Sequence, residues 1–245
     1  MLLHQKSKPW AILIVLLVVC FPLTLCAMSP FERLLKPLEG LKSAKLSETR
    51  IADGLREALR VGIDNAVNAT GKVDGFFGNE AIKIAMPEKV QMIEKGLRVI
   101  GLGPKIDDFI LSMNRAAEGA VPYARDIFID AIMDMSFDDA MAVYKGGDTA
   151  ATDFFKAKTH DKLVAAFLPQ ARKALDNYDV TKKYRELTGL YQKLPFADKL
   201  PAFDVEEYVV SKTIDGLFSV LAEEEKKIRT QPSARVTDVL KEVFK

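Results

Sequence analysis

The chain has 245 residues, of which 49% are hydrophobic and 28% are charged; this is typical of a globular protein with a buried core and excludes a disordered polymer. Its 35 lysines and arginines balance 34 aspartates and glutamates, without a basic stripe of interleaved aromatic residues. We therefore expect no nucleic-acid partner.

The first 27 residues have the layout of a secretory signal. Lys6 and Lys8 precede the apolar run 10–21, and residues 22–27 add a proline and small residues. The run is shorter than the roughly 20 apolar residues that a membrane span requires. We predict a processed signal, with an uncleaved membrane anchor as the alternative.

Two kinds of processing fit this signal. Residues 23–26 (LTLC) resemble a lipobox, in which Cys26 becomes the lipidated N-terminus, although Leu25 stands where glycine or alanine is usual. Signal peptidase could instead cut after Ala27, where Leu25 is a bulky residue two positions earlier. The sequence leaves both open, and it provides for membrane contact only through this N-terminal segment or a lipid on Cys26.

Few residues remain for thiol or imidazole chemistry after the signal. Cys20, Cys26 and His4 all lie in it, so His160 is the single histidine of the mature chain. This inventory excludes a disulfide framework, a thiol nucleophile and a histidine-rich zinc site. Any Ser-His-Asp arrangement would have to use His160, and we expect no cofactor.

The folded part is predicted to begin with a helix. Residues 28–46 contain two prolines and a glycine and are predicted to be a tether, so that an all-α domain covers residues 47–245. Ser47 is a suitable N-cap for an amphipathic helix whose apolar residues recur every four positions from Ile51 to Val67.

The next stretch, residues 68–86, is predicted to be the longest loop. Its Phe76 and Phe77 either contact a partner or a membrane, or fill the domain's own core. We expect at least one of them in the core, because most large apolar side chains of folded proteins are buried. The alternation across 82–84 (Ile-Lys-Ile) indicates a short extended segment, too brief for a sheet.

Two amphipathic helices follow this loop. Pro87 suits the first position of a helix that ends before Gly101, and a second helix continues to the break expected at Pro122. Arg115 and Glu118 stand three residues apart on the polar face of the second helix. They are predicted to be a solvated ion pair.

Three aspartates, Asp126, Asp130 and Asp134, recur every four residues along one edge of the next helix. Ca²⁺ or Mg²⁺ could relieve the repulsion between these like charges, because both ions take carboxylate oxygens. No Asp-x-Asp-x-Asp-Gly loop accompanies them. A solvated edge, or pairing with neighbouring cations such as Arg115, is therefore favoured over a metal site.

A helix start is predicted after this edge. Ser136 and Asp139 form the pattern of a capping box, in which the serine side chain and the residue three positions later exchange hydrogen bonds with each other's backbone N–H. The helix that they start is expected to end at Lys145, because glycines follow it.

The glycine-led joint that follows is a candidate anion site. Asp148 could cap a helix through Phe155, and exposed N–H groups at such a start attract anions. The candidate ligand residues are Gly146, Gly147, Asp148 and Thr149, with Arg115 as a candidate cation. Asp148 competes with an anion through its own charge and no P-loop pattern follows, so helix punctuation is favoured.

Four further helices are predicted in the C-terminal part. Thr159 or Asp161 caps the first, residues 181–194 form the second, Asp204 caps the long third one, and a short fourth follows Pro232.

The long third helix spans 205–229 and ends in the charged run 223–229. There acids precede bases by four residues, which predicts a solvated helix end. With no strand pattern or repeat, the sequence predicts a single all-α domain of about eight to ten helices.

Several segments together resemble one bacterial family. They are, in chain order, LREALRVGIDNAV, DGFFGNEAIKIAMPEKV, GLG followed by DDFILSMNRAAEGAVP, GGDTAATDFF and DGLFSVLAEEEKKIR. From about Ser47 to the C-terminus, the chain resembles the bacterial domain-of-unknown-function family 4197. The resemblance implies an exported, mostly helical protein in the periplasm or cell envelope of Gram-negative bacteria. It implies no activity, ligand or catalytic residue.

Three functions are compatible with these residues. The first is a non-enzymatic protein that binds an envelope protein or a small ligand, favoured by the export signal and by the absence of thiols and clustered histidines. The second is a hydrolase that uses carboxylates with a bound metal. The third is an envelope lipid carrier, which requires an apolar cavity between helices.

Overall fold

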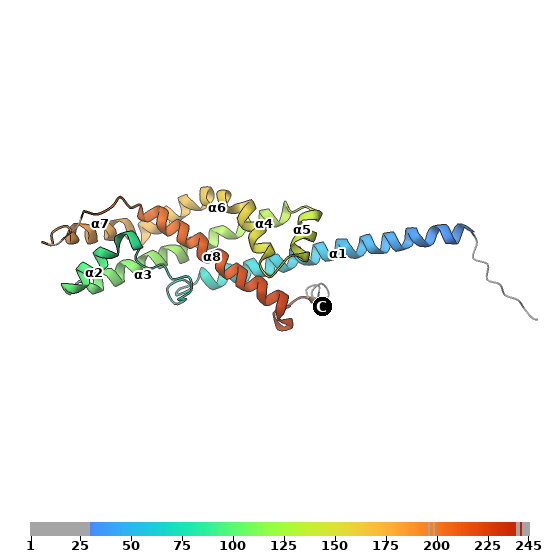
Figure 1. Ribbon diagram of the computed structural model, residues 1–245, viewed down its shortest axis with the longest axis horizontal. Coiled ribbons are helices and arrows are strands. Elements are labelled where there is room, and N and C mark those ends of the chain that lie inside the picture. The colour runs from blue at the N-terminus through green and yellow to red at the C-terminus, as the bar shows by residue number, and fades with distance from the viewer. Residues whose placement is uncertain (1–29, 196, 198, 239–240, 242–245) are drawn as a thin grey trace, which may run out of the picture. The chain divides into compact units, whose positions relative to one another are not determined.

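The computed structural model describes residues 30–195, 197, 199–238 and 241 (Figure 1). The predicted signal, with Cys20 and Cys26, lies outside these residues. The chain divides into two compact units, Met1–Ala44 and Lys45–Lys245, and the second is the helical domain. Within the described part of the chain, no helix is long and apolar enough to cross a membrane.

The described residues form eight α-helices and three short 3-10 helices, and no strand, which confirms the all-α prediction. The α-helices are α1 (Pro30–Thr70), α2 (Gln91–Val99), α3 (Gly103–Ala120), α4 (Ala124–Met133), α5 (Phe137–Lys145), α6 (Ala150–Asn177), α7 (Val180–Tyr191) and α8 (Val205–Thr230). The 3-10 helices are η1 (Glu88–Val90), η2 (Val121–Tyr123) and η3 (Pro232–Ala234).

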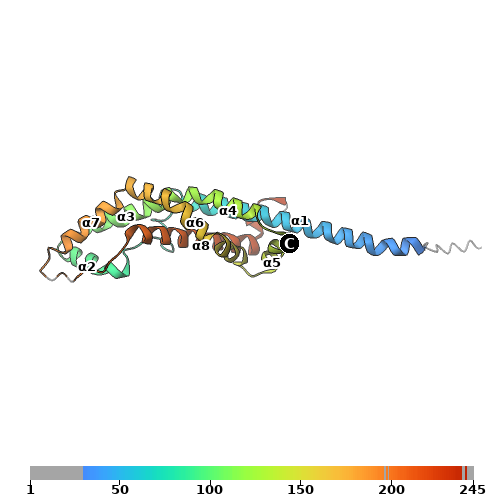
Figure 2. The same cartoon turned by 90° about the horizontal axis from the view of Figure 1, so that it is seen from above.

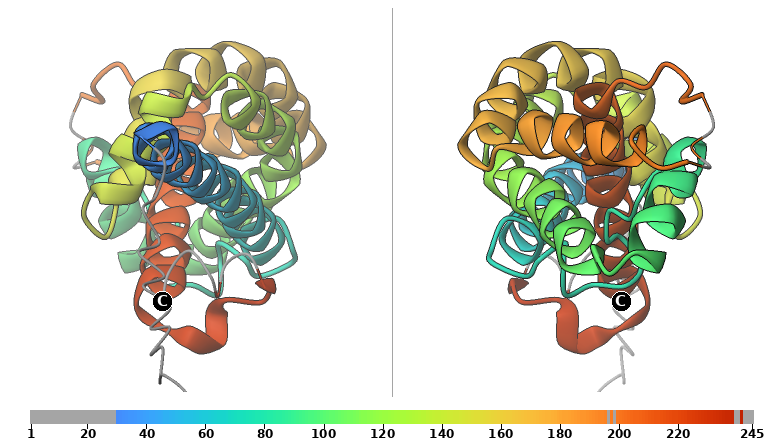
Figure 3. Two further views of the ribbon diagram at one scale, coloured as in Figure 1. Left: turned by 90° about the vertical axis from the view of Figure 1, so that its right-hand side faces the viewer. Right: turned by 90° about the vertical axis from the view of Figure 1, so that its left-hand side faces the viewer.

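Helices α6 and α8 form the centre of the domain. They pack against each other, and α6 also contacts α3, α4, α5 and α7 (Figures 2 and 3). The apolar residues of α8 cover a wide arc, as expected for a helix that is packed on more than one side. Phe218 of α8 meets Phe128 of α4 edge to face, with ring centroids 5.7 Å apart, and Phe128 in turn meets Phe155 of α6.

Local signals placed most helix ends correctly. Ser136 Oγ accepts a hydrogen bond from Asp139 N (3.1 Å) while Asp139 Oδ2 accepts one from Ser136 N (3.2 Å), so the predicted capping box is confirmed. Asp204 Oδ1 accepts from the backbone N–H groups of Glu206 and Glu207 at the start of α8. Pro122 interrupts the helical path as part of η2, as predicted.

Two predicted helix starts, at Ser47 and near Thr159, are wrong. Helix α1 begins at Pro30, so the stretch 30–46 that was predicted to be a tether is helical; proline is tolerated at a first helical position, where its missing N–H would have no intrahelical acceptor. Helix α6 is continuous where a new cap was expected near Thr159. The Thr159 hydroxyl instead donates to Phe155 O (2.6 Å) within the helix. The predicted C-terminal helix is described only as far as η3, and its Leu240 and Phe244 lie outside the described residues.

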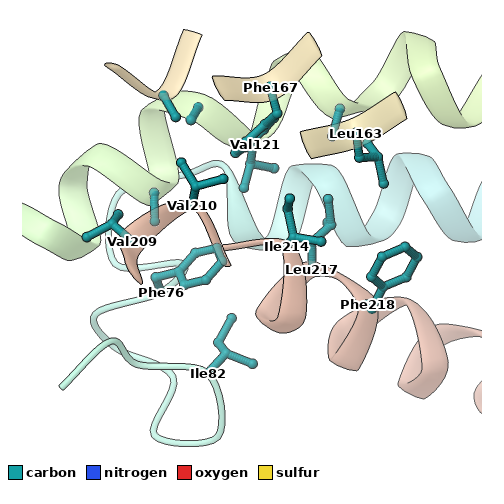
Figure 4. Packing of buried hydrophobic residues seen from close by; sticks show 14 of the residues in the cluster. Phe76, Ile82, Val121, Leu163, Phe167, Val209, Val210, Ile214, Leu217 and Phe218 are labelled. Carbon is teal, nitrogen blue, oxygen red and sulfur yellow. The ribbon is translucent and has the colours of Figure 1, made fainter. Parts of the chain in front are cut away.

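The loop after α1 folds onto α8 through Phe76. This side chain is fully buried, which confirms the prediction of a core role, whereas Phe77 is half-buried beneath Lys83 Nζ, 4.5 Å from the ring centroid. Phe76 lies against Gly216 of α8, in the core region drawn in Figure 4. A glycine is needed there, because a Cβ at position 216 would lie 2.6 Å from Phe76 Cε1.

Replacing this glycine is therefore expected to destabilise the domain. Gly216→Ala should lower the free energy of unfolding by about 1–3 kcal/mol, the range for overpacking a core. Gly189→Ala in α7 is the matched control: its Cβ would meet no atom within 4 Å, so the change should be neutral or stabilise by up to about 1 kcal/mol. Urea unfolding followed by circular dichroism measures both, and equal midpoints would contradict the close packing of Phe76 on Gly216.

Candidate functional site

The aspartate edge of α4 is open to solvent. Asp126, Asp130 and Asp134 are all exposed, and the nearest cation to Asp126 is its neighbour Arg125 at 3.8 Å. Asp134 is the C-cap of α4. Among the described residues, no three histidine, cysteine, aspartate or glutamate side chains are grouped so that they could hold a metal ion. The geometry is that of a solvated edge, and a metal on these residues stays a prediction.

Arg115 fixes the loop after α1 instead of pairing with that edge. Its guanidinium donates to Glu118 Oε2 (2.6 Å) and to Asp74 Oδ1 (2.7 Å), and the bond to Glu118 raises the pKa of Arg115 above its ordinary value. Glu118 Oε1 accepts from the backbone N–H groups of Phe76 and Phe77, both at 3.1 Å. The pair predicted to be solvated is therefore partly buried, with Glu118 only 3% exposed, because the loop covers it.

The glycine-led joint before α6 receives an anion from the chain itself. The carboxylate of Glu225, on α8, accepts from Ala151 N (2.9 Å), Thr152 N (2.9 Å) and the Thr152 hydroxyl (2.9 Å). Asp148 does not cap the helix; Thr149 is the N-cap residue, and its hydroxyl donates to Asp153. The N–H groups that could attract a ligand at this helix start thus already bind Glu225.

Arg229 completes this contact from the next turn of α8. Its side chain lies 2.8 Å from Glu225 Oε1 and also donates to the backbone oxygens of Val143 (2.8 Å) and Tyr144 (3.4 Å). The carboxylate thus lies at the N-terminus of α6 and the guanidinium at the C-terminus of α5, where each charge is favoured by the helix dipole. We call these two side chains the Glu225–Arg229 clamp. It lies in the run that was predicted to be solvated, so that prediction is wrong for these two residues.

An apolar cavity beside the clamp is too small for an organic ligand. It lies between α1, α6 and α8, with Leu59, Phe155 and Leu221 among its lining residues, and its volume of ≈ 20 Å³ is room for about one water molecule. An acyl chain does not fit in this space.

The larger hollows lie on the surface at the N-terminal half of α8. Two adjoining grooves of ≈ 680 Å³ and ≈ 920 Å³ share three lining residues, Lys89, Phe203 and Tyr208. The smaller groove runs between residues 81–91 and α8, and the larger one between the start of α8 and α7. We call the two together the Tyr208 groove.

An aromatic ridge separates the two halves of the Tyr208 groove. The ring centroids of Tyr184 and Phe203 are 5.5 Å apart, and those of Phe203 and Tyr208 are also 5.5 Å apart. Tyr208 donates its hydroxyl to Ala85 O (3.1 Å), and partial burial, with a smaller contribution from Glu88, raises the pKa of Tyr208. At the other end, the Tyr184 ring packs on the buried Phe109, with centroids 5.9 Å apart, and burial raises the pKa of Tyr184. Both phenols are therefore neutral near pH 7.

Two lysines of the groove have no acidic partner among the described residues. Lys89 and Lys212 form no salt bridge with any acid in the described part of the chain, and Lys212 Nζ lies 6.0 Å from the Tyr208 ring centroid. The sequence analysis did not predict the Tyr208 groove, because the prolines of 195–203 indicated only a loop between two helices. Its signal was the two aromatic residues Phe203 and Tyr208 on either side of a helix cap.

His160, the single histidine after residue 27, is half-exposed on α6. Its Nδ1 lies 3.3 Å from Asp161 Oδ1, an adjacent and fully exposed carboxylate. Among the described residues, no serine hydroxyl lies within hydrogen-bond distance of its ring. The geometry needed for a Ser-His-Asp nucleophile is thus not formed there.

The chain matches one protein family over most of its length. The family described as "Protein of unknown function (DUF4197)" matches residues 45–245, the same range as the second compact unit. No curated protein and no solved structure matches the chain.

Removing the charge of the clamp is expected to cost much more stability than removing a neighbouring charge. Glu225→Gln should lower the free energy of unfolding by about 2–4 kcal/mol, because it leaves Arg229 without its buried counter-charge and places an amide group against backbone donors. Glu223→Gln, the same change at an exposed position of α8, should stay within about 0.5 kcal/mol. Urea unfolding measures both values, and a mild Glu225→Gln variant would show that the clamp contributes little.

Proposed function

The chain belongs to the DUF4197 family of proteins of unknown function, and we propose that it is an exported, non-enzymatic binding protein of the Gram-negative cell envelope. The observation that carries the proposal is the Tyr208 groove, where aromatic side chains and two lysines outside the fold's ion pairs surround an open surface hollow.

Export is supported by the sequence of the first 27 residues. Two lysines, an apolar run and small residues stand in the order of a secretory signal, and Cys26 offers a lipidation site. The cysteines and all but one histidine fall within that segment, so the remaining chain tolerates an oxidising compartment without forming disulfides.

A binding role is favoured over catalysis because the buried carboxylates are already committed. A general acid or base must reach the proton that it transfers, yet Glu118 and Glu225 both bind two backbone N–H groups and an arginine. The cavity that Glu225 borders, of ≈ 20 Å³, is also too small for a substrate. The phenol of Tyr208, with its raised pKa, is a hydrogen-bond donor near pH 7 and not a base.

The Tyr208 groove has the properties of a recognition surface. Its two halves, ≈ 680 Å³ and ≈ 920 Å³, fall in the usual size range of ligand sites. Tyrosine and phenylalanine offer large rigid contact areas at a small entropic cost. Lys89 and Lys212 can bind an anionic ligand without the loss of an internal ion pair, because neither has an acidic partner in the described part of the chain.

Export is tested by fractionating a Gram-negative host that produces the full chain and weighing its N-terminus by mass spectrometry. We expect the protein in the envelope fraction, starting either at a lipidated Cys26 or at Met28. Cys26→Ser should abolish only the lipidated form, whereas Leu16→Arg, which interrupts the apolar run, should leave the chain in the cytoplasm. An intact N-terminus at Met1 in the cytoplasm of cells that carry the unaltered chain would overturn the export proposal.

Binding at the groove is tested by photo-cross-linking in living cells. A photoreactive benzoylphenylalanine at Ser211, an exposed residue of the groove, should give discrete adducts on irradiation. The same group at Lys226, exposed further along α8, is the control and should give none. Equal adduct patterns at both positions, or none at either, would contradict a binding surface at the groove.

A further inference from the structure

We propose that the Tyr208 groove binds an extended peptide segment of a partner protein, which adds as a strand beside residues 83–87 and places a carboxylate near Lys89 and Lys212. This inference rests on the proposed binding function and specifies its ligand.

Residues 83–87 already have the form of one strand of a sheet. The segment contains no helix or turn, and side-chain burial alternates from Lys83 to Met86: Ile84 and Met86 are 1% and 4% exposed, whereas Ala85 between them is exposed. Pro87, which follows Met86, is buried as well. Pro87 is also extended, with φ −60° and ψ 138°. The period of two residues fits the extended segment predicted from the alternation across 82–84 at Lys83 and Ile84, whereas Ile82 lies in a turn and its N–H donates to Asn79 O (3.1 Å).

One edge of this strand is paired by a side chain. Asn114 of α3, which is fully buried, accepts from Ile84 N (2.9 Å) through Oδ1 and donates to Ile84 O (2.8 Å) through Nδ2. A residue directs its N–H and C=O to the same side only in an extended backbone, and a neighbouring strand would offer the same pair of partners. The amide of Asn114 therefore takes the place of a strand on the inner edge.

The opposite edge faces the smaller half of the Tyr208 groove and is open at Ala85. The N–H of Lys83 is not available, because it already donates to Asn79 O (2.9 Å). Backbone groups of adjacent residues in a strand alternate in direction, so those of Ala85 face away from Asn114. Ala85 O accepts from the Tyr208 hydroxyl, which confirms this direction, and a carbonyl oxygen can accept a second bond. Ala85 N has no hydrogen-bond acceptor among the described residues. An unpaired strand edge is a template for another extended chain.

The charges beside this edge favour a carboxylate on the ligand. The smaller groove contains three cations, Lys83, Lys89 and Lys212, against two acids, Glu88 and Asp215. Lys83 pairs with Glu80 (3.3 Å), but Lys89 and Lys212 form no salt bridge with a described acid. A C-terminal carboxylate or an acidic side chain would supply their counter-charge.

A second copy of this chain fits the edge less well than an acidic peptide. Symmetric pairing brings the same patch of two molecules together, so the lysines would face lysines. The edge is also short, because Pro87 ends it, and lysine beside an exposed edge discourages self-pairing.

The test selects ligands from a phage-displayed library of random nine-residue peptides with free C-termini, using the full-length chain. Selected peptides are synthesised, and their affinity is measured by fluorescence anisotropy. We expect peptides that carry a carboxylate, and about fivefold weaker binding to Lys89→Gln and to Lys212→Gln. Lys95→Gln, an exposed lysine of α2 outside the groove, is the control and should bind as the unaltered chain does.

Strand addition is diagnosed by removing backbone donors. In an added strand, only every second N–H group of the peptide faces the protein. N-methylation of those residues should weaken binding about tenfold or more, whereas N-methylation of the residues between them should leave binding unchanged. Ala85→Pro removes the free donor of the protein and should weaken binding similarly, and circular dichroism checks that this variant still folds. The methylated peptides give the same information without changing the protein.

Other outcomes would overturn the inference in distinguishable ways. Peptides that bind without alternation, or that are insensitive to both lysine changes, would exclude strand addition, as would a library that yields no binder. If Ser211 nevertheless gives cross-linked adducts in cells, the binding function stands and only the peptide assignment fails. Concentration-dependent dimers that Ala85→Pro abolishes would assign the edge to a second copy of the chain.

Discussion

The Glu225–Arg229 clamp is the interaction on which the arrangement of the helices most depends. Two residues one turn apart on α8 hold the end of α5 and the start of α6, so the joint between these helices is fixed to the centre of the domain. Burying two charges carries a large desolvation cost, which excellent geometry and further hydrogen bonds must offset. Here both conditions are met, because the carboxylate has three donors from α6 and the guanidinium has backbone acceptors from α5.

The same arrangement recurs on α3. Arg115 and Glu118 also stand on one face of a helix, and their carboxylate also takes two successive backbone N–H groups, this time from the Phe76 loop. That contact positions Phe76 against Gly216 and so connects the loop with α8. In the described part of the chain, the two buried acids, Glu118 and Glu225, thus both anchor backbone N–H groups of another segment.

The features that could be predicted from the sequence are those set by neighbouring residues. The capping box at Ser136, the cap at Asp204 and the break at Pro122 depend on contacts within about four residues, and all three are confirmed. The Glu225–Arg229 pair could not be predicted in this way. An acid and a base four residues apart give the same sequence pattern on a solvated helix and on a buried one. This pair is buried because the distant segment 143–152 packs on it.

The Tyr208 groove could not be predicted from the sequence either, because it too depends on residues that are distant along the chain. Its walls come from segments more than 100 residues apart, and the Tyr208 hydroxyl meets Ala85 O across a separation that no local pattern records. The alternation around Ile84 did indicate an extended segment, but its partner is the side chain of Asn114 and not another strand. In the described part of the chain, no buried side-chain nitrogen or oxygen lacks a hydrogen-bond partner. The polar groups that the fold leaves without a partner therefore lie at the surface, and the N–H of Ala85 with Lys89 and Lys212 beside it brings such groups together.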